Sequence, residues 1–171
     1  LNVSFQNVLD DRPQPSSAYG IVGWTKGDEH VLINDRYDIW KISMLGGETT
    51  CVTDGFGREN RIVLRYSRFD LEGDDDTLSP DEKLYRPDTI LLTAKNDITK
   101  ARGYYTDTVS GVDRPKKLLM IDRSIGGLTR AKKADRLFFT VSTFAEFPDV
   151  WVADMRFRQR RKLTDACPLQ R

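Results

Sequence analysis

Residues 37–44 read Tyr-Asp-Ile-Trp-Lys-Ile-Ser-Met, and residues 148–155 read Pro-Asp-Val-Trp-Val-Ala-Asp-Met. The Asp, Trp and Met positions of the two segments coincide without a gap. At the same offset of 111 residues, Val52-Thr53-Asp54 falls on Leu163-Thr164-Asp165. A strand that carries Asp and Trp, a turn, and a second strand that ends in Thr-Asp therefore occur twice. Such a repeat indicates equivalent structural units, and we place its two copies in successive units.

The first copy lies within a series of short segments rich in β-branched and aromatic residues. These predicted strands are residues 19–24, 30–34, 38–44 and 48–53. The segments between them contain Gly, Asn or Asp, which tolerate the positive φ of tight turns: Lys26-Gly27-Asp28, Asn34-Asp35-Arg36 and Gly46-Gly47. Four short strands joined by tight turns predict a four-stranded antiparallel meander, which is the unit of a β-propeller blade.

The rest of the chain continues this pattern. Further strands are predicted at residues 61–66, 89–93, 118–122, 136–141, 150–154 and 161–164, and residues 94–102 form at most a turn or two of helix. A degenerate middle copy of the repeat runs from 118–122 to 126–129, with Gly126-Gly127 as a hairpin turn. At about 40–45 residues per blade, the chain holds three to four blades. We therefore predict an all-β fold, a partial β-propeller.

The expected domain organisation has three parts. Residues 1–17 form an N-terminal extension, residues 18–171 form the partial propeller, and an acidic segment near 67–88 is an exposed loop inserted in the second unit. The start of the chain lacks an initiator Met, a basic flank and an apolar signal core, which indicates a processed or excised chain. A disulfide between Cys51 and Cys167 is left open, because no framework of closely spaced cysteines supports it.

Composition excludes several function classes. Lys and Arg total 27 against 26 Asp and Glu, which argues against a dedicated nucleic-acid or anionic-membrane binder. We interpret the basic run from Arg156 to Lys162 as a solvated edge. No stretch approaches the roughly 18 apolar residues of a membrane span, so membrane insertion is not expected.

The chain offers no catalytic residue set. Its only histidine, His30, starts a predicted strand, and we interpret it as a blade-edge residue. Asp74, Asp75 and Asp76 lack the spacing of a calcium-binding loop, and two Cys with one His cannot make a zinc site. We therefore predict no catalytic residue, no metal and no cofactor. Trp40 and Trp151 are expected to pack between neighbouring blades instead of stacking on a ligand.

The chain resembles the propeller domain of prolyl oligopeptidase-type serine peptidases, in the branch of dipeptidyl and acylaminoacyl peptidases. The resemblance covers about residues 18–170. It rests on residues 24–28 (Trp-Thr-Lys-Gly-Asp), the Tyr37–Trp40 segment, residues 144–151 (Phe-Ala-Glu-Phe-Pro-Asp-Val-Trp) and residues 161–166 (Arg-Lys-Leu-Thr-Asp-Ala). The hydrolase domain of that family and its Gly-x-Ser-x-Gly elbow are absent from this sequence.

The resemblance implies a non-catalytic propeller segment that restricts access and positions peptide substrates for a hydrolase domain. Peptides or such a domain are then the expected partners, and a periplasmic or secreted location is favoured over a cytoplasmic one. Substrate-binding residues stay unassigned, with Arg65, Arg68 and Arg102 as candidates for holding a substrate terminus. The alternative is a stand-alone protein-binding or scaffold module, whose open blade edges would favour a homodimer. A glycan-binding propeller is a third option.

Overall fold

The computed structural model describes residues 3–67, 89–109, 111 and 113–166. The strands of this part of the chain form three four-stranded antiparallel sheets, each assembled in chain order. Blade 1 contains β1 Ile21–Trp24, β2 His30–Asn34, β3 Ile39–Ser43 and β4 Thr49–Cys51. Blade 2 contains β5 Ile62–Tyr66, β6 Thr89–Asn96, β7 Arg102–Thr108 and β8 Lys116–Ile121. Blade 3 contains β9 Ser124–Arg130, β10 Arg136–Ser142, β11 Asp149–Asp154 and β12 Arg161–Lys162.

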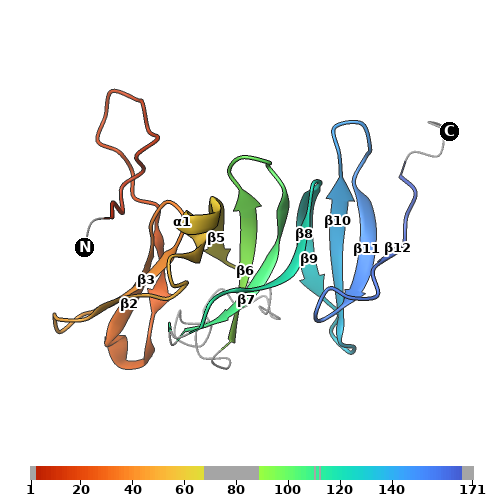
Figure 1. Ribbon diagram of the computed structural model, residues 1–171. Coiled ribbons are helices and arrows are strands. Elements are labelled where there is room, and N and C mark those ends of the chain that lie inside the picture. The colour runs from red at the N-terminus through yellow and green to blue at the C-terminus, as the bar shows by residue number, and fades with distance from the viewer. Residues whose placement is uncertain (1–2, 68–88, 110, 112, 167–171) are drawn as a thin grey trace.

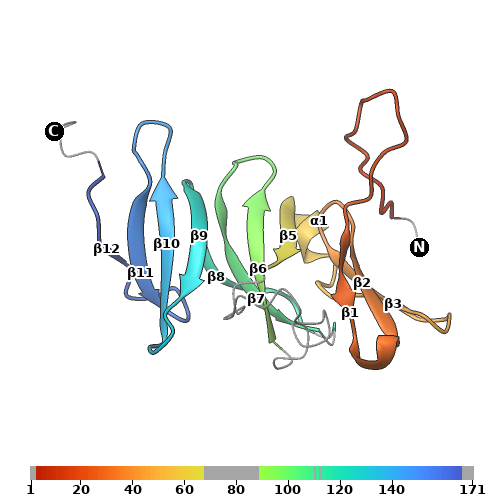
Figure 2. The same cartoon turned by 180° about the vertical axis from the view of Figure 1, so that it is seen from behind.

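The three sheets stand side by side in chain order, as the two opposite views in Figures 1 and 2 show. The fold is an all-β partial β-propeller, and its described residues contain three blades. Apolar side chains fill the two seams between the blades because a sheet that is flanked on one face must bury that face. Leu32, Ile39, Leu64 and Leu92 belong to the core between blades 1 and 2, and each is fully buried.

The seam between blades 2 and 3 has a more aromatic core. Tyr104 of β7 stacks on Phe157, with ring centroids 4.6 Å apart, and Phe139 of β10 packs against the same Phe157 ring at 5.6 Å. Phe157 has a φ of 54°, a left-handed conformation that is uncommon for a bulky residue. Burial of its whole ring between the two sheets offsets this strain.

Helical structure in the described part of the chain is limited to two short elements. The 3-10 turn η1, Lys26–Asp28, joins β1 to β2, and α1, Phe56–Asn60, joins blade 1 to blade 2. Gly57 in α1 lies so close to blade 1 that an added Cβ would approach the Tyr37 carbonyl oxygen to 2.6 Å. Neither of these helices has the length and apolar run that crossing a membrane would require.

The structure corrects the placement of the repeat. Trp40 lies on β3 and Trp151 on β11, so the two copies occupy the third strands of blades 1 and 3, with blade 2 between them. The predicted middle copy, residues 118–129, is also wrong, because it joins the last strand of blade 2 to the first strand of blade 3. The true counterpart in blade 2 begins at β7, where no Asp-aliphatic-Trp sequence is present.

One further local prediction is wrong, and the structure decides another that set only an upper limit. Gly126 and Gly127 lie inside β9 and not in a hairpin turn; Gly127 has a φ of 59° and sits where the pairing with β10 shifts register. Glycine supplies this left-handed residue at a β-bulge without a steric penalty. Residues 94–102 contain no helix: β6 continues to Asn96, and Asn96 then accepts hydrogen bonds from the Ile98 and Thr99 N–H groups to form a tight turn. Gly46-Gly47, by contrast, lies in the turn between β3 and β4, as predicted.

Residues 3–20 run outside the three sheets and are held by a bridge between Gln6 and Ala18. Phe5 from this segment packs edge-on against Trp40, with ring centroids 6.5 Å apart. The acidic insertion predicted near 67–88 lies outside the described residues apart from Ser67, and with it Arg68 and Asp74, Asp75 and Asp76. Cys51 is a free thiol, and Cys167 lies outside the described residues.

Candidate functional site

The repeated Asp and Thr form the same hydrogen-bonded latch in both copies. In blade 1 the Thr53 hydroxyl donates to Asp38 Oδ1 at 2.7 Å, and the Ile39 N–H donates to the Thr53 hydroxyl at 3.3 Å. In blade 3 the Thr164 hydroxyl donates to Asp149 Oδ1 at 3.0 Å, and the Val150 N–H donates to the Thr164 hydroxyl at 2.9 Å. The spacing found in the sequence therefore has a physical cause, since it ties the start of the third strand to the end of the fourth.

The two latches differ in the charges that surround the carboxylate. Asp38 is buried in blade 1, where burial raises the pKa of its carboxyl despite hydrogen bonds from Thr53 and from the Gly57 and Arg58 N–H groups. Asp149 is also buried, with 9% of its surface exposed, but the ammonium of the exposed Lys162 lies 2.7 Å away and holds the pKa of Asp149 below its usual range. The same sequence position is thus a buried acceptor in both blades, and only in blade 3 does its carboxylate pair with a cation.

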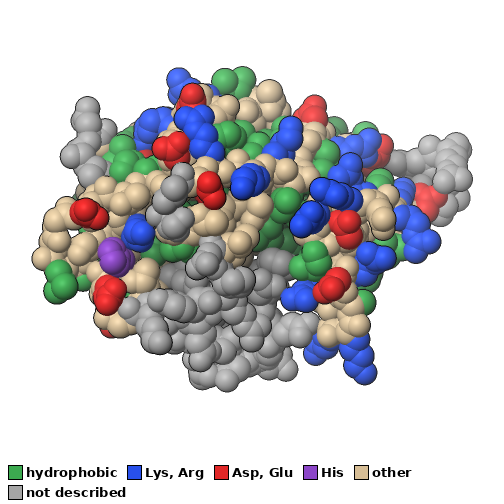
Figure 3. Space-filling model, turned by 60° about the horizontal axis from the view of Figure 1, so that its bottom comes forward, with side chains coloured by type: hydrophobic (Ala, Val, Ile, Leu, Met, Phe, Trp, Pro, Cys, Tyr) green, Lys and Arg blue, Asp and Glu red, His purple; other side chains and the backbone are tan. Residues whose placement is uncertain are grey.

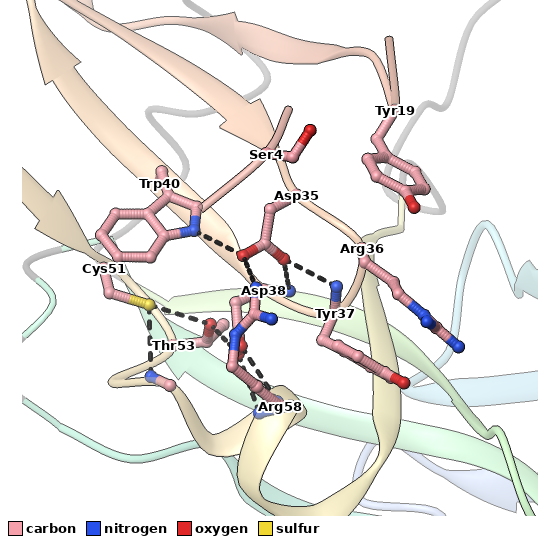
Figure 4. Close-up of polar contacts among 12 residues, drawn as sticks. Ser4, Tyr19, Asp35, Arg36, Tyr37, Asp38, Trp40, Cys51, Thr53 and Arg58 are labelled. Carbon is pink, nitrogen blue, oxygen red and sulfur yellow. Dashed lines mark hydrogen bonds and ion pairs between the residues drawn. The ribbon is translucent and has the colours of Figure 1, made fainter. Parts of the chain in front are cut away.

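Asp35 is the centre of a closed polar cluster around Trp40 (Figure 4). Its side chain is fully buried and accepts four donors. Oδ1 accepts the Tyr37 and Asp38 N–H groups at 2.7 and 2.6 Å, while Oδ2 accepts the Trp40 indole N–H at 3.0 Å and the Arg58 guanidinium at 2.5 Å. Every strong acceptor position of this carboxylate is used inside the protein, so the cluster is structural.

Arg65 and Arg36 extend this cluster to the seam with blade 2. The Arg65 guanidinium on β5 donates to the carbonyl oxygens of Asp35 and Arg36 at 2.9 and 3.3 Å, and burial lowers its pKa. Arg36 pairs with Asp97 at 2.8 Å, and the Tyr37 hydroxyl donates to the same carboxylate at 3.1 Å. These bonds join the β2–β3 turn of blade 1 to the β6–β7 turn of blade 2.

The arginines suggested by the sequence do not form a common site. Arg65 is committed to backbone carbonyls in the first seam, Arg102 is exposed at the start of β7, and Arg68 lies outside the described residues. His30 begins β2, where its N–H donates to the Thr25 hydroxyl at 2.9 Å. Within the described part of the chain, no three His, Cys, Asp or Glu side chains are grouped closely enough to hold a metal ion.

Trp151, the Trp of the second repeat copy, lines a pocket. Trp151 is paired directly with Phe139 of β10, so both side chains lie on the face of blade 3 that meets blade 2. There they line a pocket of about 430 Å³. The other lining residues are Ile121, Asp122, Arg123, Val141 and Arg160. Trp40 and Trp151 are both only partly buried, so the prediction that they pack between blades is met only in part. Of these two side chains, Trp151 is the one that is accessible to a ligand.

The polar groups of this pocket are mainly hydrogen-bond donors. Arg160 is anchored through one guanidinium N–H, which donates to the Phe157 carbonyl at 2.7 Å, and Arg123 pairs with Glu146. Because a guanidinium carries five N–H donors, both residues keep donors to spare. The Trp151 indole N–H has no acceptor among the described residues. Asp122 is the single carboxylate in the lining. An apolar floor with these donors at its rim suits an apolar group that carries a carboxylate.

Blade 3 also carries an excess of basic residues. Residues 124–166 contain nine Lys and Arg against five Asp and Glu. Figure 3 shows Lys and Arg side chains gathered over the part of the surface formed by β9–β12. The run from Arg156 to Lys162 is exposed, as predicted, apart from the buried Phe157. Such a field raises the association rate of anionic ligands.

No sequence pattern indicates this pocket. Arg123 lies in the connection between blades 2 and 3, and Arg160 lies between β11 and β12 inside blade 3, so neither stands out in a strand pattern. The exception is Trp151, which the repeat identified for a different reason.

Comparisons with known proteins add little to this geometry. No protein-family model and no curated protein matches the chain. Among solved structures, "putative TolB from Agrobacterium tumefaciens" is similar, with 13% sequence identity and a TM-score of 0.37. The similarity covers 85% of this chain and 61% of that one, so the chain spans less than two thirds of the length of that protein.

Proposed function

We propose that the chain is a non-catalytic propeller module that binds a peptide or protein segment at the pocket between blades 2 and 3. The observation that carries this proposal is the donor-rich rim of Arg123, Arg160 and the Trp151 indole around an apolar floor. An apolar side chain enters the pocket, and a neighbouring carboxylate binds at the rim. Burial of one large apolar side chain contributes about 1.5–3 kcal/mol, and a charge-assisted hydrogen bond about 1.5–3 kcal/mol.

The finer proposal is an accessory role beside a hydrolase domain. The sequence resemblance to prolyl oligopeptidase-type peptidases supports a peptide as the occupant, because propellers of that family restrict access and position peptides. The chain would then act by exclusion and positioning, while bond cleavage would take place on another domain. Chromogenic Xaa-Pro and acyl-peptide substrates should show no turnover with this chain alone. The encoding reading frame provides a second test, because the peptidase role requires a Gly-x-Ser-x-Gly segment downstream.

The binding proposal is tested by fluorescence and calorimetric titration with the peptide acetyl-Ala-Ala-Phe. The free carboxylate form should bind in the micromolar to millimolar range and change Trp emission, while its amide should bind at least tenfold more weakly. Arg160→Met should weaken the carboxylate form at least tenfold, whereas Arg136→Met, a matched exposed control, should not. Equal binding of acid and amide, or an unaffected Arg160→Met, would contradict the pocket assignment.

A second candidate function is the stand-alone scaffold module. Phe138, Val150 and Val152 share the face of blade 3 that points away from blade 2, and all three are only half-buried. Half-exposed apolar sheet faces favour association. In this version two chains pack through these faces into a homodimer. Light scattering that finds a dimer, reduced to a monomer by Val152→Glu, supports it, and a monomer at all concentrations argues against it.

A further inference from the structure

Asp107 is a buried carboxylate whose hydrogen bonding is incomplete. It lies on β7 with 4% of its surface exposed. Oδ1 accepts the Thr108 N–H at 2.8 Å, but Oδ2 is buried without a hydrogen-bond partner among the described residues. An unpaired buried carboxylate costs free energy unless it is protonated or meets a cation. Asp107 therefore differs from Asp35 and Asp38, whose oxygens are satisfied inside the fold.

The surroundings of Asp107 leave it ionised at neutral pH. Burial raises the pKa of its carboxyl to about 6, and the charges of Asp113 and Asp54 act in the same direction, while Lys116 opposes them. Arg114, the other nearby cation, is bound to Asp54 and Glu59, each at 2.9 Å. Above pH 6 Asp107 is thus an anion without a directly paired cation, and its Oδ2 has no hydrogen-bond donor among the described residues.

Asp107 lines a pocket of about 110 Å³ at the end of blade 2 where β6 begins and β7 ends. Asp113 and the hydroxyl-bearing Thr89, Thr106 and Thr108 line the same pocket, together with Arg114 and Lys116. At about 30 Å³ for each water-sized group, it holds roughly three or four such groups. The hydroxyl and carboxylate oxygens are all hydrogen-bond acceptors, and an ammonium group carries three donors.

We propose that this pocket binds a primary ammonium group, such as the end of a lysine side chain of a partner protein, with Asp107 Oδ2 as its main acceptor. A quaternary ammonium has no N–H donor and would need aromatic walls, which the lining lacks. A calcium ion takes six to eight oxygen ligands, whereas a single ammonium group is satisfied by three acceptors. This site lies in blade 2, apart from the donor-rich pocket, and does not depend on it.

The test is a titration of the whole chain with n-propylammonium chloride at constant ionic strength and pH 7, followed by amide NMR. Saturable shifts should centre on Asp107 and Thr108, and n-propanol and tetramethylammonium should cause none. Asp107→Asn should weaken binding at least tenfold, and Asp113→Asn should weaken it less. Asp135→Asn, an exposed carboxylate in the β9–β10 turn, is the matched control and should bind as the wild type does.

The pH dependence gives an independent readout. Since only the ionised carboxylate attracts the cation, a pKa of about 6 predicts that affinity falls about tenfold from pH 7 to pH 5. Asp107→Asn should remove this dependence. Absence of saturable binding, undiminished binding by Asp107→Asn, or calcium binding in preference to propylammonium would each overturn the proposal. None of these outcomes bears on the pocket between blades 2 and 3, so failure here is distinguishable from failure of the proposed function.

Discussion

The two copies of the repeat occupy the same strand position in their blades and differ in the residues that surround the Trp. In blade 1, Asp35 binds the Trp40 indole N–H, and Phe5 packs against the Trp40 ring. In blade 3, the residue at the position of Asp35 is Glu146, which is exposed and pairs with Arg123 instead. The Trp151 indole is left to line a pocket. The same strand motif is therefore closed by buried hydrogen bonds in one blade and open to a ligand in the other.

This difference separates the structural part of the motif from the part that is free to bind. The Asp-Thr latch is present in both copies, so it belongs to the architecture of the blade. The turn before the third strand is what differs. The short buried Asp35 in this turn points back to the Trp, whereas the longer exposed Glu146 reaches across to Arg123 in the connection between blades 2 and 3. A one-methylene change at this turn thus accompanies the change from a sealed Trp to an accessible one.

The largest difference between the two copies is expected when the carboxylate of Asp35 is removed. Asp35→Ala leaves the Arg58 guanidinium and three N–H donors without their acceptor, and we expect a loss of about 3–5 kcal/mol in the free energy of unfolding. Glu146→Ala at the equivalent position should change it by about 0.5 kcal/mol or less, because this ion pair is exposed. Urea denaturation measures both variants. Similar losses in the two would show that the copies are closed in the same way.

A smaller effect should distinguish the two indoles. Trp40→Phe and Trp151→Phe remove similar ring area, but only the first breaks a hydrogen bond to a buried carboxylate. We therefore expect Trp40→Phe to cost about 1–2 kcal/mol more in the free energy of unfolding than Trp151→Phe. Trp151→Phe should instead reduce peptide binding at the pocket. Equal costs, measured by thermal unfolding of both variants, would mean that Trp151 has found an acceptor of its own.

The sequence pattern predicts most strands and their grouping into blades, but it does not predict the contacts between neighbouring blades. Period and turn chemistry act within a few residues, so β1–β4 were predicted nearly residue by residue. β7 was missed because Arg102-Gly103-Tyr104-Tyr105 follows a turn that resembles a helix start, and because Gly103 weakens a strand pattern. Its glycine is required by the close approach of the Leu119 carbonyl, a contact with a strand that comes later in the chain.

The candidate sites depend on contacts between blades, which explains why the sequence did not reveal them. Arg123 and Arg160 are separated by most of blade 3, and only the packing of two sheets brings them to one pocket. The charge of Arg65 suggests ligand binding, but its guanidinium donates hydrogen bonds to backbone carbonyl oxygens between blades 1 and 2. Asp107 reads as an ordinary strand residue until its burial is known.

The smallest effect concerns the two latch carboxyls, whose pKa values are shifted in opposite directions. Lys162 lowers the pKa of Asp149, so the stabilisation from that ionised carboxylate is present above the ordinary pKa of Asp and is lost as pH falls through the lowered value. Burial raises the pKa of Asp38, so its ionisation disfavours the fold as pH rises through the raised value.

Lys162→Met should therefore raise the pKa of Asp149 and leave that of Asp38 unchanged, as measured by carbon NMR of the carboxyl groups. The Asp149 pKa should stay below that of a free Asp, because the Thr164 hydroxyl and the Ala166 N–H still bind the carboxylate. An unchanged Asp149 pKa in Lys162→Met would assign its low value to the latch hydrogen bonds alone, and the Lys162 ion pair would then have no part in the difference between the two copies.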